Sequence, residues 1–230
     1  MGTLISYRLE NSVATIAMDD GKVNALSPDM LSELNAALDR AAADRAVVVL
    51  TGRPGVFSAG FDLTVLRAGG RPSALMVAAG FELAARLLSF PAPVLIACTG
   101  HAMAMGAFLL MSGDYRIGVA GPYKFSVNEV AIGLTVPQAA IEICRQRLTP
   151  AHLSRAVLLA EVFSPEDALA AGFVDRLAAD GELADLVAST AARLATLDLD
   201  AHEVTKLRAR QPALAAIRAA IDTDYAAVRA

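Results

Sequence analysis

Residues 93–108 read PVLIACTGHAMAMGAF, an apolar run that ends in a glycine-bearing loop and continues into a helical pattern. Residues 47–62, VVVLTGRPGVFSAGFD, repeat the arrangement. Continuous apolar runs bounded by glycine are typical of strands that are covered on both faces. Loops after such strands are where α/β proteins bind ligands, and small residues let the backbone come close to them. The two stretches, in a helix-rich chain, suit an α/β or α+β fold, and they mark where a ligand site would lie.

The rest of the chain alternates strands with helices and then becomes helical. Residues 3–10 and 12–18 predict an opening hairpin, and residues 25–44 predict a helix with Ser27 as its N-cap. After Pro150, which is expected to follow a helix cap at Thr149, the patterns are mainly helical. No linker rich in Gly, Ser or Pro separates two domains. We expect one domain, with a core at residues 1–178 and a helical region, part of that domain or a subdomain, at residues 179–230.

Residues 67–73, RAGGRPS, predict a mobile loop in front of a helix at residues 74–90. Further along, Ser164 and Asp167 have the spacing of a capping box, and Gly172 is expected to end that short helix.

Composition narrows the class of protein. The 230 residues are 55% hydrophobic and carry a net charge of −4, and no basic cluster is long enough to indicate nucleic-acid binding. No apolar run reaches the ~18 residues of a membrane span, and no signal peptide is apparent, so we expect a cytoplasmic protein that does not bind membranes. Cys98 and Cys144 are interpreted as reduced core residues. Three histidines predict no metal cluster.

Neither glycine-bearing loop establishes a site by itself. Both lack the GxxxxGK[ST] and GxGxxG patterns of phosphate-binding loops. Two backbone N–H groups that converge on one oxygen would form an oxyanion hole, whereas a turn followed by core packing is the simpler alternative. His101 could titrate near neutral pH, but a structural hydrogen bond is the commoner role of a histidine in a tight loop. Asp62 and Asp114 are interpreted as residues that cap or bond nearby backbone.

Glu129 is the candidate acid or base. It stands in an otherwise apolar segment, residues 123–137, YKFSVNEVAIGLTVP. A desolvated carboxylate has a raised pKa, which suits general acid–base chemistry, while a surface glutamate at a strand end is the alternative. The apolar residues expected to surround it are Val127, Val130, Ile132 and Leu134.

Taken together, these motifs resemble the crotonase superfamily, the enoyl-CoA hydratases and isomerases, and above all its bacterial, mycobacterial-type members labelled enoyl-CoA hydratase. The resemblance runs in order from residue 4 to about residue 178. VFSAGFDL (56–63) resembles F-x-A-G-x-D-[LI], and CTGHAMAMGAFLLMSGD (98–114) resembles N-G-x-A-x-G-G-G-x-x-L followed by a C-D pair. GKVNALSPDM (21–30), KFSVNEVAIGLTVP (124–137) and EVFSPEDALAAGFVDRL (161–177) are similar to the family's N-A-[LF]-[ST], F-x-x-P-E-x-x-x-G-x-x-P and A-x-x-x-G-L-V-[DN]-x-[VL] segments.

The resemblance implies an α/β fold: a spiral of ββα units with two roughly perpendicular sheets, and C-terminal helices that build trimers or dimers of trimers. It implies chemistry on acyl-CoA thioesters, in which an oxyanion hole stabilises an enolate. The hole's donors would be the backbone N–H groups of Phe61 and Met105. Coenzyme A enters as part of the substrate, and neither a permanent cofactor nor a metal is implied. The residues expected beside coenzyme A are Lys22, Val23, Ala25, Ala59 and Asp62.

The chain departs from the family's hydratases at three places. Hydratases use two glutamates; the second matches Glu129, but the position of the first is Phe108. The proline before the second glutamate is Asn128, and two glycines of the triplet are Ala104 and Met105. His101 and Phe108 are then expected beside the acyl pocket, and the apolar segment at residues 67–88 is expected to line or cover it.

One carboxylate beside an oxyanion hole suffices to move a proton, so the residues favour double-bond isomerisation with Glu129 as the single acid/base. A true enoyl-CoA hydratase of fatty-acid degradation is one alternative. A non-catalytic acyl-CoA binder and a subunit that serves mainly in assembly are the others.

Overall fold

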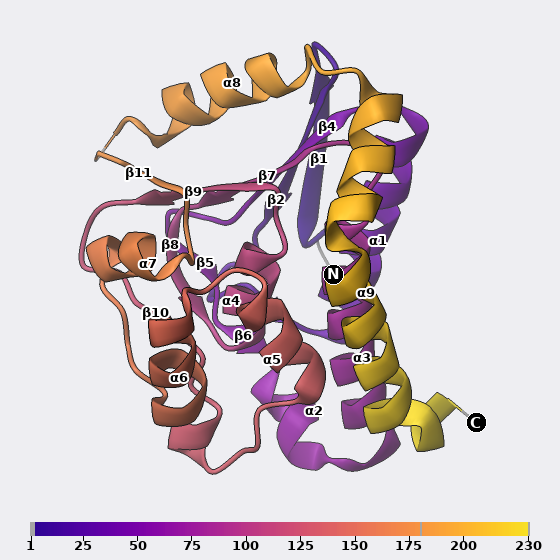
Figure 1. The fold of residues 1–230 in the computed structure, drawn as a ribbon, viewed down its shortest axis with the longest axis vertical. Helices are drawn as coiled ribbons and strands as arrows, with labels where there is room; N and C mark the ends of the chain where they lie inside the picture. Colours follow the sequence, from indigo (N-terminus) through magenta and orange to yellow (C-terminus); the bar gives the residue numbers. More distant parts are fainter. Residues whose placement is uncertain (1–2, 180, 230) are drawn as a thin grey trace.

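A six-stranded sheet forms the frame of the computed structural model, which describes residues 3–179 and 181–229 (Figure 1). Its strand order is β1-β2-β4-β7-β9-β11; β1 and β2 are antiparallel, and every later pair is parallel. These strands are β1 (Ile5–Glu10), β2 (Val13–Met18), β4 (Val47–Thr51), β7 (Val94–Cys98), β9 (Tyr115–Val119) and β11 (Arg176–Ala178). The predicted hairpin is confirmed: Asn11 and Ser12 both have positive φ, as a tight two-residue turn requires.

The central strands are buried on both faces because their apolar side chains alternate between two cores. Val48 and Ile96 belong to the large core, which also contains residues of α1 (Pro28–Ala43) and α3 (Gly70–Leu88). Val49 and Leu95 belong to a smaller core beneath α8 (Leu183–Leu194). The continuous apolar runs thus have the cause expected from the sequence: successive side chains of a strand point to opposite faces, and helices cover both.

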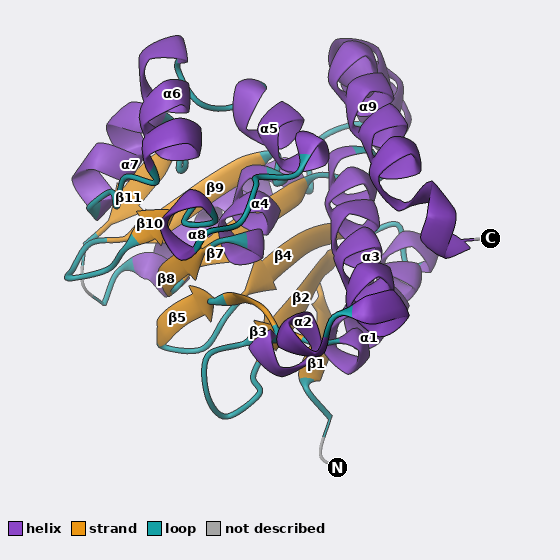
Figure 2. Ribbon diagram, turned by 90° about the horizontal axis from the view of Figure 1, so that it is seen from below, coloured by secondary structure: helices purple, strands orange, loops and turns teal. Residues whose placement is uncertain are grey.

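The helices lie in two layers around this sheet. Figure 1 shows α8 alone on one side, while α1, α3, α4 and α5 lie on the other. The last helix, α9 (Leu199–Arg229), runs along α3 and α5 (Figures 1 and 2). The remaining helices are α2 (Leu63–Ala68), α4 (Met105–Met111), α5 (Gln138–Arg145), α6 (Pro150–Leu159), α7 (Pro165–Ala171) and the 3₁₀ turn η1 (Val130–Ile132).

Two small sheets fix the loops that follow β4 and β7. One has the order β10-β8-β5 and the other pairs β3 with β6. Their strands are β3 (Ala25–Leu26), β5 (Gly55–Ser58), β6 (Gly60–Phe61), β8 (Gly100–Met103) and β10 (Phe125–Ser126). Because β5, β6 and β8 come directly after the two central strands, the glycine-bearing loops are paired backbone and not free turns.

Most predicted caps are present. Ser27 Oγ accepts the N–H of Met30 at 3.1 Å, Thr149 precedes α6, and Ser164 Oγ accepts the N–H of Asp167 at 3.1 Å. Cys98 and Cys144 are free and buried, as predicted. In the part of the chain that the structure describes, we find no helix both long and apolar enough to cross a membrane.

The predicted loop at residues 67–73 is wrong. Arg67 and Ala68 end α2, and Gly70 already begins α3. Gly69, at φ +67°, makes the single-residue turn between the two helices. Pro72 lies in the first turn of α3, where a proline displaces no helical hydrogen bond. The pattern of Gly and Pro therefore marks a helix boundary and not a loop.

Candidate active site

The loops after β4 and β7 meet at Gly60. A Cβ atom on Gly60 would lie 2.9 Å from the Cβ of Ala104 and 3.2 Å from the backbone nitrogen of Met105. Gly106 is equally close to the other loop, since its added Cβ would lie 2.3 Å from the carbonyl oxygen of Ser58. Only glycine allows such backbone contacts. The structure thus brings the residues next to Phe61 and Met105, the two predicted N–H donors, against one another.

Both candidate donors are held by regular structure. Phe61 belongs to β6, which pairs with β3, and Met105 is the first residue of α4, where backbone N–H groups have no partner within the helix. Ala104 turns the chain into α4 at φ +48° and ψ −125°. An alanine with positive φ is strained by about 1–3 kcal/mol, and the surrounding contacts must hold it there. This strain explains why the family motif has glycine at this position.

Two buried polar side chains tie the early motif to the first loop. Asn24 donates its side-chain N–H to the carbonyls of Met18 and Phe57, both at 3.1 Å. Ser58 Oγ donates to the carbonyl of Asn24 at 2.8 Å and accepts the N–H of Gly60 at 3.2 Å. Sequence reasoning named neither role. The signal was a polar residue inside each motif, Asn24 in KVNAL and Ser58 in VFSAG.

The residues expected beside coenzyme A lie together on this framework. The N–H of Ala59 donates to the carbonyl of Val23 at 3.0 Å, and Ala25 pairs with Gly60. Lys22 is exposed, and its carbonyl accepts a hydrogen bond from an Arg53 guanidinium nitrogen at 2.9 Å.

Asp62 has the local role that its sequence position indicated. Its side chain caps α2 by accepting the N–H of Thr64 at 2.7 Å. The cap fixes the chain directly after Phe61.

Glu129 is buried, and only 8% of the residue is exposed. Burial raises the pKa of its carboxyl group to about 7. Its backbone is fixed, because the Glu129 carbonyl accepts the N–H groups of Ile132 and Leu134 at 3.1 and 2.9 Å. Its Oε2 atom is buried and has no hydrogen-bond partner among the residues that the structure describes. A carboxyl group with a raised pKa and a free oxygen is equipped for proton transfer.

The surroundings of Glu129 differ from the sequence prediction. Val127 is buried, but Val130, Ile132 and Leu134 are 46%, 56% and 44% exposed. The 3₁₀ turn after Glu129 carries Val130 and Ile132 outward, and Leu134 lies just beyond its end at Gly133. Glu129 also lies near α5, where burial and, after it, the charge of Glu129 raise the pKa of the Cys144 thiol.

Phe108 is the residue that the sequence matches to the first glutamate of the family's hydratases. Phe108 is fully buried in α4, and its ring lies 6.0 Å from that of Phe81 in α3. It contributes to the core and has no group that could exchange a proton. His101 Nδ1 accepts the N–H of Lys124 at 3.0 Å, so this histidine makes a structural hydrogen bond within the small sheet.

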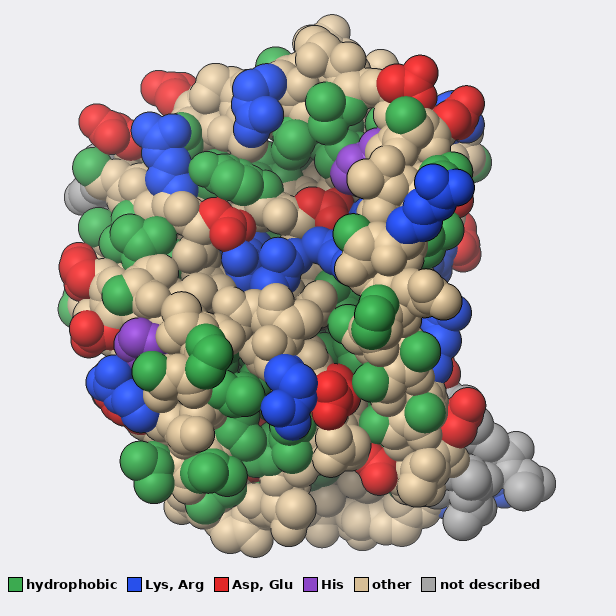
Figure 3. All heavy atoms as spheres, viewed as in Figure 1, with side chains coloured by type: hydrophobic (Ala, Val, Ile, Leu, Met, Phe, Trp, Pro, Cys, Tyr) green, Lys and Arg blue, Asp and Glu red, His purple; other side chains and the backbone are tan. Residues whose placement is uncertain are grey.

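Asp114 does more than bond nearby backbone. It accepts the N–H of Val94 at 2.7 Å, as its position suggested, and it also pairs with Lys206 and Arg210 of α9, both at 2.7 Å. The sequence gives no sign of these partners, which lie more than 90 residues away. Figure 3 shows basic and acidic side chains together in a hollow beside α9. These ion pairs dock the last helix onto the core.

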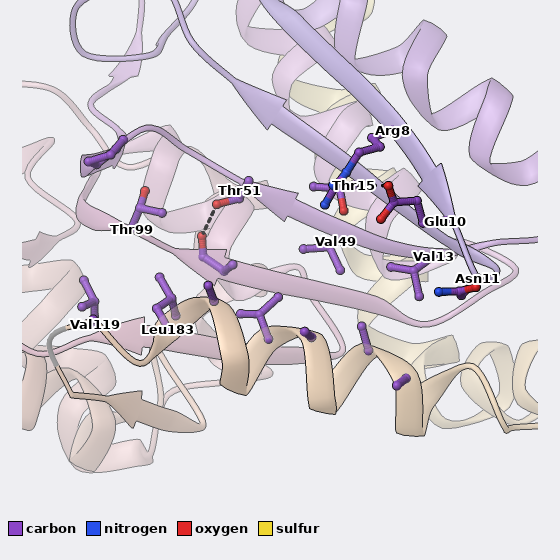
Figure 4. A pocket seen from close by; sticks show the side chains of 18 of the residues that line it. Arg8, Glu10, Asn11, Val13, Thr15, Val49, Thr51, Thr99, Val119 and Leu183 are labelled. Atoms are coloured by element: carbon purple, nitrogen blue, oxygen red, sulfur yellow. Dashed lines mark hydrogen bonds and ion pairs between the residues drawn. The ribbon is translucent and has the colours of Figure 1, made fainter.

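The large cavity of the described chain lies elsewhere. It has a volume of about 850 Å³ between α8 and the sheet, and none of the candidate site residues lines it. Figure 4 shows Thr15, Thr51 and Thr99 on the strand side of this cavity. Cavity size therefore does not identify the candidate active site, which is defined by the contacts of the two loops and Glu129.

The fold and the site define the class of protein. A family model described as enoyl-CoA hydratase/isomerase matches residues 8–225, so the chain belongs to the enoyl-CoA hydratase/isomerase family of enzymes, in the lyase or isomerase class. The crotonase-type fold is confirmed by solved structures. An enoyl-CoA isomerase of Mycobacterium tuberculosis is 50% identical with a TM-score of 0.94, covering 98% of this chain and 99% of the other. The enoyl-CoA hydratase EchA3 of Mycobacterium ulcerans is 49% identical with a TM-score of 0.93, covering 97% and 98%.

A human relative is also similar. Mitochondrial enoyl-CoA delta isomerase 1 is 29% identical over 221 residues, which are 92% of this chain and 72% of the human protein. The predicted likeness to mycobacterial members is confirmed, and the names of the relatives divide between hydratase and isomerase.

Proposed function

We propose that this enzyme isomerises the double bond of enoyl-CoA thioesters, with Glu129 as its single acid/base. The observation that supports this proposal is the pairing of one buried carboxyl group, whose pKa is raised to about 7, with a phenylalanine at the other family position. At pH 7 about half of the molecules would carry the carboxylate, so the same group can both take and return a proton.

The reaction balances without any further group. The N–H groups of Phe61 and Met105 bind the thioester oxygen of a 3-enoyl-CoA, and the Glu129 carboxylate removes a proton from C2. The electron pair of that C–H bond moves into a dienolate, whose negative oxygen the two donors stabilise. The protonated Glu129 then returns the proton at C4, and the double bond ends between C2 and C3. The product is a 2-enoyl-CoA, and Glu129 is again ionised.

Hydration of a 2-enoyl-CoA needs more from the site. A water molecule must be held and deprotonated for attack at C3 while a proton is delivered to C2. Phe108 cannot take part, so both tasks would fall on Glu129. Loss of one general acid or base costs about 10²–10⁴-fold in rate, and we expect hydration to be slower than isomerisation by a factor in this range.

The coenzyme A part of the substrate is proposed to lie along Lys22, Val23, Ala25, Ala59 and Asp62. The observation that supports this is the exposed edge they form beside Gly60 and Phe61. Ala59→Trp is expected to raise KM about tenfold with a smaller effect on kcat, because the ring would occupy the edge and leave Glu129 in place. Ala170→Trp, on the exposed face of α7, is the control. Equal effects of the two changes on KM would remove Ala59 from the binding surface.

We also propose a homo-oligomer, a trimer or a dimer of trimers. Exposed apolar side chains lie on η1 and on α6 and the turn after it, and hydrophobic side chains gather over α6 in Figure 3. A patch of this kind on a protein surface commonly marks an interface. The side chains are Val130, Ile132, Leu158, Leu159 and Val162. Sedimentation of the wild type and of Leu159→Glu tests this: a wild-type monomer, or a variant whose oligomer is unchanged, counts against this patch as the interface.

The function is tested by comparing two reactions in one preparation: isomerisation of 3-hexenoyl-CoA and hydration of crotonyl-CoA. We expect isomerisation to be faster, and Glu129→Gln to abolish it. Glu161→Gln, at a half-buried residue paired with Arg155, is expected to leave isomerisation unchanged. Hydration at the rate of isomerisation or above would overturn the single-base argument. Binding of acyl-CoA without turnover of either substrate would show the non-catalytic alternative to be correct.

A further inference from the structure

Gly80 stands in the middle of α3, where glycine is unfavourable. A glycine inside a helix destabilises it by roughly 0.5–1 kcal/mol relative to alanine. Its backbone does not require glycine, since Gly80 is absent from the residues with positive φ. It is buried, so exposure to solvent does not explain it either. The reason must lie in what occupies the space beside it.

That space holds side chains of both candidate oxyanion donors. A Cβ atom on Gly80 would lie 2.5 Å from Cε1 and Cζ of the Phe61 ring and 3.5 Å from Sδ of Met105. The first distance is far below van der Waals contact, and the second is an ordinary contact. The Phe61 ring also contacts Phe81, with ring centroids 6.3 Å apart and ring planes at 74°. The Phe61 ring thus packs directly against the backbone of α3 at Gly80.

We propose that Gly80 is a positioning residue that sets the direction of the Phe61 N–H group relative to that of Met105. This rests on the proposed function, in which these two groups bind the thioester oxygen. A methyl group at position 80 would displace the Phe61 ring, and the displacement would pass to its backbone through the two-residue strand β6. A displacement of about 1 Å in a reacting geometry can cost on the order of 10²-fold in rate.

A purely structural role for Gly80 predicts something different. Gly113 offers a matched control, because its added Cβ would lie 2.4 Å from Cγ1 of Ile96, a core side chain outside the candidate site. If Gly80 mattered only for packing, Gly80→Ala and Gly113→Ala would both lower stability and both leave the bound thioester unaffected. If Gly80 positions the Phe61 N–H group, Gly80→Ala changes the hydrogen bonding of the substrate carbonyl and Gly113→Ala does not.

The test measures the thioester carbonyl directly. A saturated acyl-CoA with a ¹³C-labelled carbonyl, butyryl-CoA, is bound to each variant, and the carbonyl stretch is measured by isotope-edited infrared spectroscopy. Hydrogen bonds from the two N–H groups lower this frequency. We expect Gly80→Ala to move it most of the way back toward the value for free butyryl-CoA, and to lower kcat about 100-fold with a change in KM of threefold or less.

Rescue by a second substitution separates positioning from damage. Phe61→Leu keeps the backbone N–H and shortens the side chain, so Gly80→Ala/Phe61→Leu is expected to recover the lowered frequency and at least tenfold of the lost kcat. Gly113→Ala should stay near wild type in both readouts, with unfolding followed by circular dichroism. Phe61→Leu alone is measured as the reference for the double variant, and its values set the largest recovery that can be expected.

An unchanged frequency in a folded Gly80→Ala variant, or a double variant no better than the single one, would overturn the proposal. The infrared readout needs no turnover, so it also separates this proposal from the proposed reaction. A wild type that lowers the frequency but isomerises nothing would refute only the proposed reaction. A wild type that leaves the frequency unchanged would refute the oxyanion hole, and the role of Gly80 with it.

Discussion

Replacing Glu129 with glutamine should make the protein more stable, and the gain should depend on pH. Burial raises the pKa of this carboxyl group from 4.5 in the unfolded chain to about 7 in the folded one. As pH rises, the carboxyl group therefore loses its proton in the unfolded state before it does so in the folded state. As a result, the folded state loses stability as pH rises above 4.5, and the loss is complete only above pH 7. A neutral glutamine removes this loss.

The size of the effect follows from the two pKa values. At 1.36 kcal/mol for each unit of pKa difference, the cost of the buried carboxylate is about 3 kcal/mol at pH 8.5 and about 1 kcal/mol at pH 5. Urea unfolding of wild type and Glu129→Gln at the two pH values measures it. The variant should be more stable at both, and its advantage should grow by about 2 kcal/mol between pH 5 and pH 8.5.

Glu161→Gln is the control with the opposite sign. The hydrogen bond from Arg155 lowers the pKa of the Glu161 carboxyl group, so that pair stabilises the folded state above the unfolded pKa and is lost as pH falls. Glu161→Gln should therefore destabilise slightly at pH 8.5 and less at pH 5. If the gain in Glu129→Gln is the same at both pH values, the argument from burial is refuted.

Three further predictions concern the site and its support. The kcat/KM of isomerisation should rise tenfold per pH unit below the Glu129 pKa of about 7 and level off above it, leaving about 1% of the plateau at pH 5; a profile that is flat from pH 5 to 8 would contradict Glu129 as the base. Ala104→Gly should stabilise the protein by about 1 kcal/mol in urea unfolding, because it relieves an alanine at φ +48°, and a loss of stability would show that the turn is not strained. Lys206→Met should destabilise by about 2 kcal/mol, because it removes one of the two cations that pair with the Asp114 carboxylate while Arg210 and the Val94 N–H remain; a change under about 0.5 kcal/mol would mean that the pair does not hold α9.

Local chemistry made several features predictable from sequence. Ser27 and Ser164 cap helices because a short hydroxyl side chain reaches the free N–H groups of the first turn. Asp62 caps α2 for the same reason. The buried strands could be recognised because apolar residues on both faces of a strand leave a continuous run. The prediction of a loop at residues 67–73 is wrong because one residue, Gly69, is enough to make the turn between α2 and α3.

The environment of Glu129 shows where sequence reasoning stops. Its desolvation was predicted from Val127, Val130, Ile132 and Leu134, which are its neighbours in the chain. The raised pKa is found and Val127 is buried, but the other three side chains point outward, and Cys144 of α5 lies near the carboxyl group. The sequence shows that a carboxyl group stands among apolar residues. Which of them cover it depends on the 3₁₀ turn that follows Glu129 and on how α5, which begins at Gln138, packs beside it.

The sequence by itself determined the family, the central strands and most of the helices, the two glycine-bearing loops, and the presence of one carboxyl group where hydratases have two. Each of these depends on residue type and short spacing. Sequence reasoning missed β11, a strand of three residues in the half of the chain expected to be helical. Only the tertiary structure decided that Gly60 contacts Ala104, that the Phe61 ring packs against Gly80, and that Asp114 pairs with Lys206. These contacts join segments about 20 to 90 residues apart, and their distances depend on how helices and loops pack against one sheet. A site built from backbone N–H groups leaves little trace in side-chain identity, so its geometry appears only when the chain is folded.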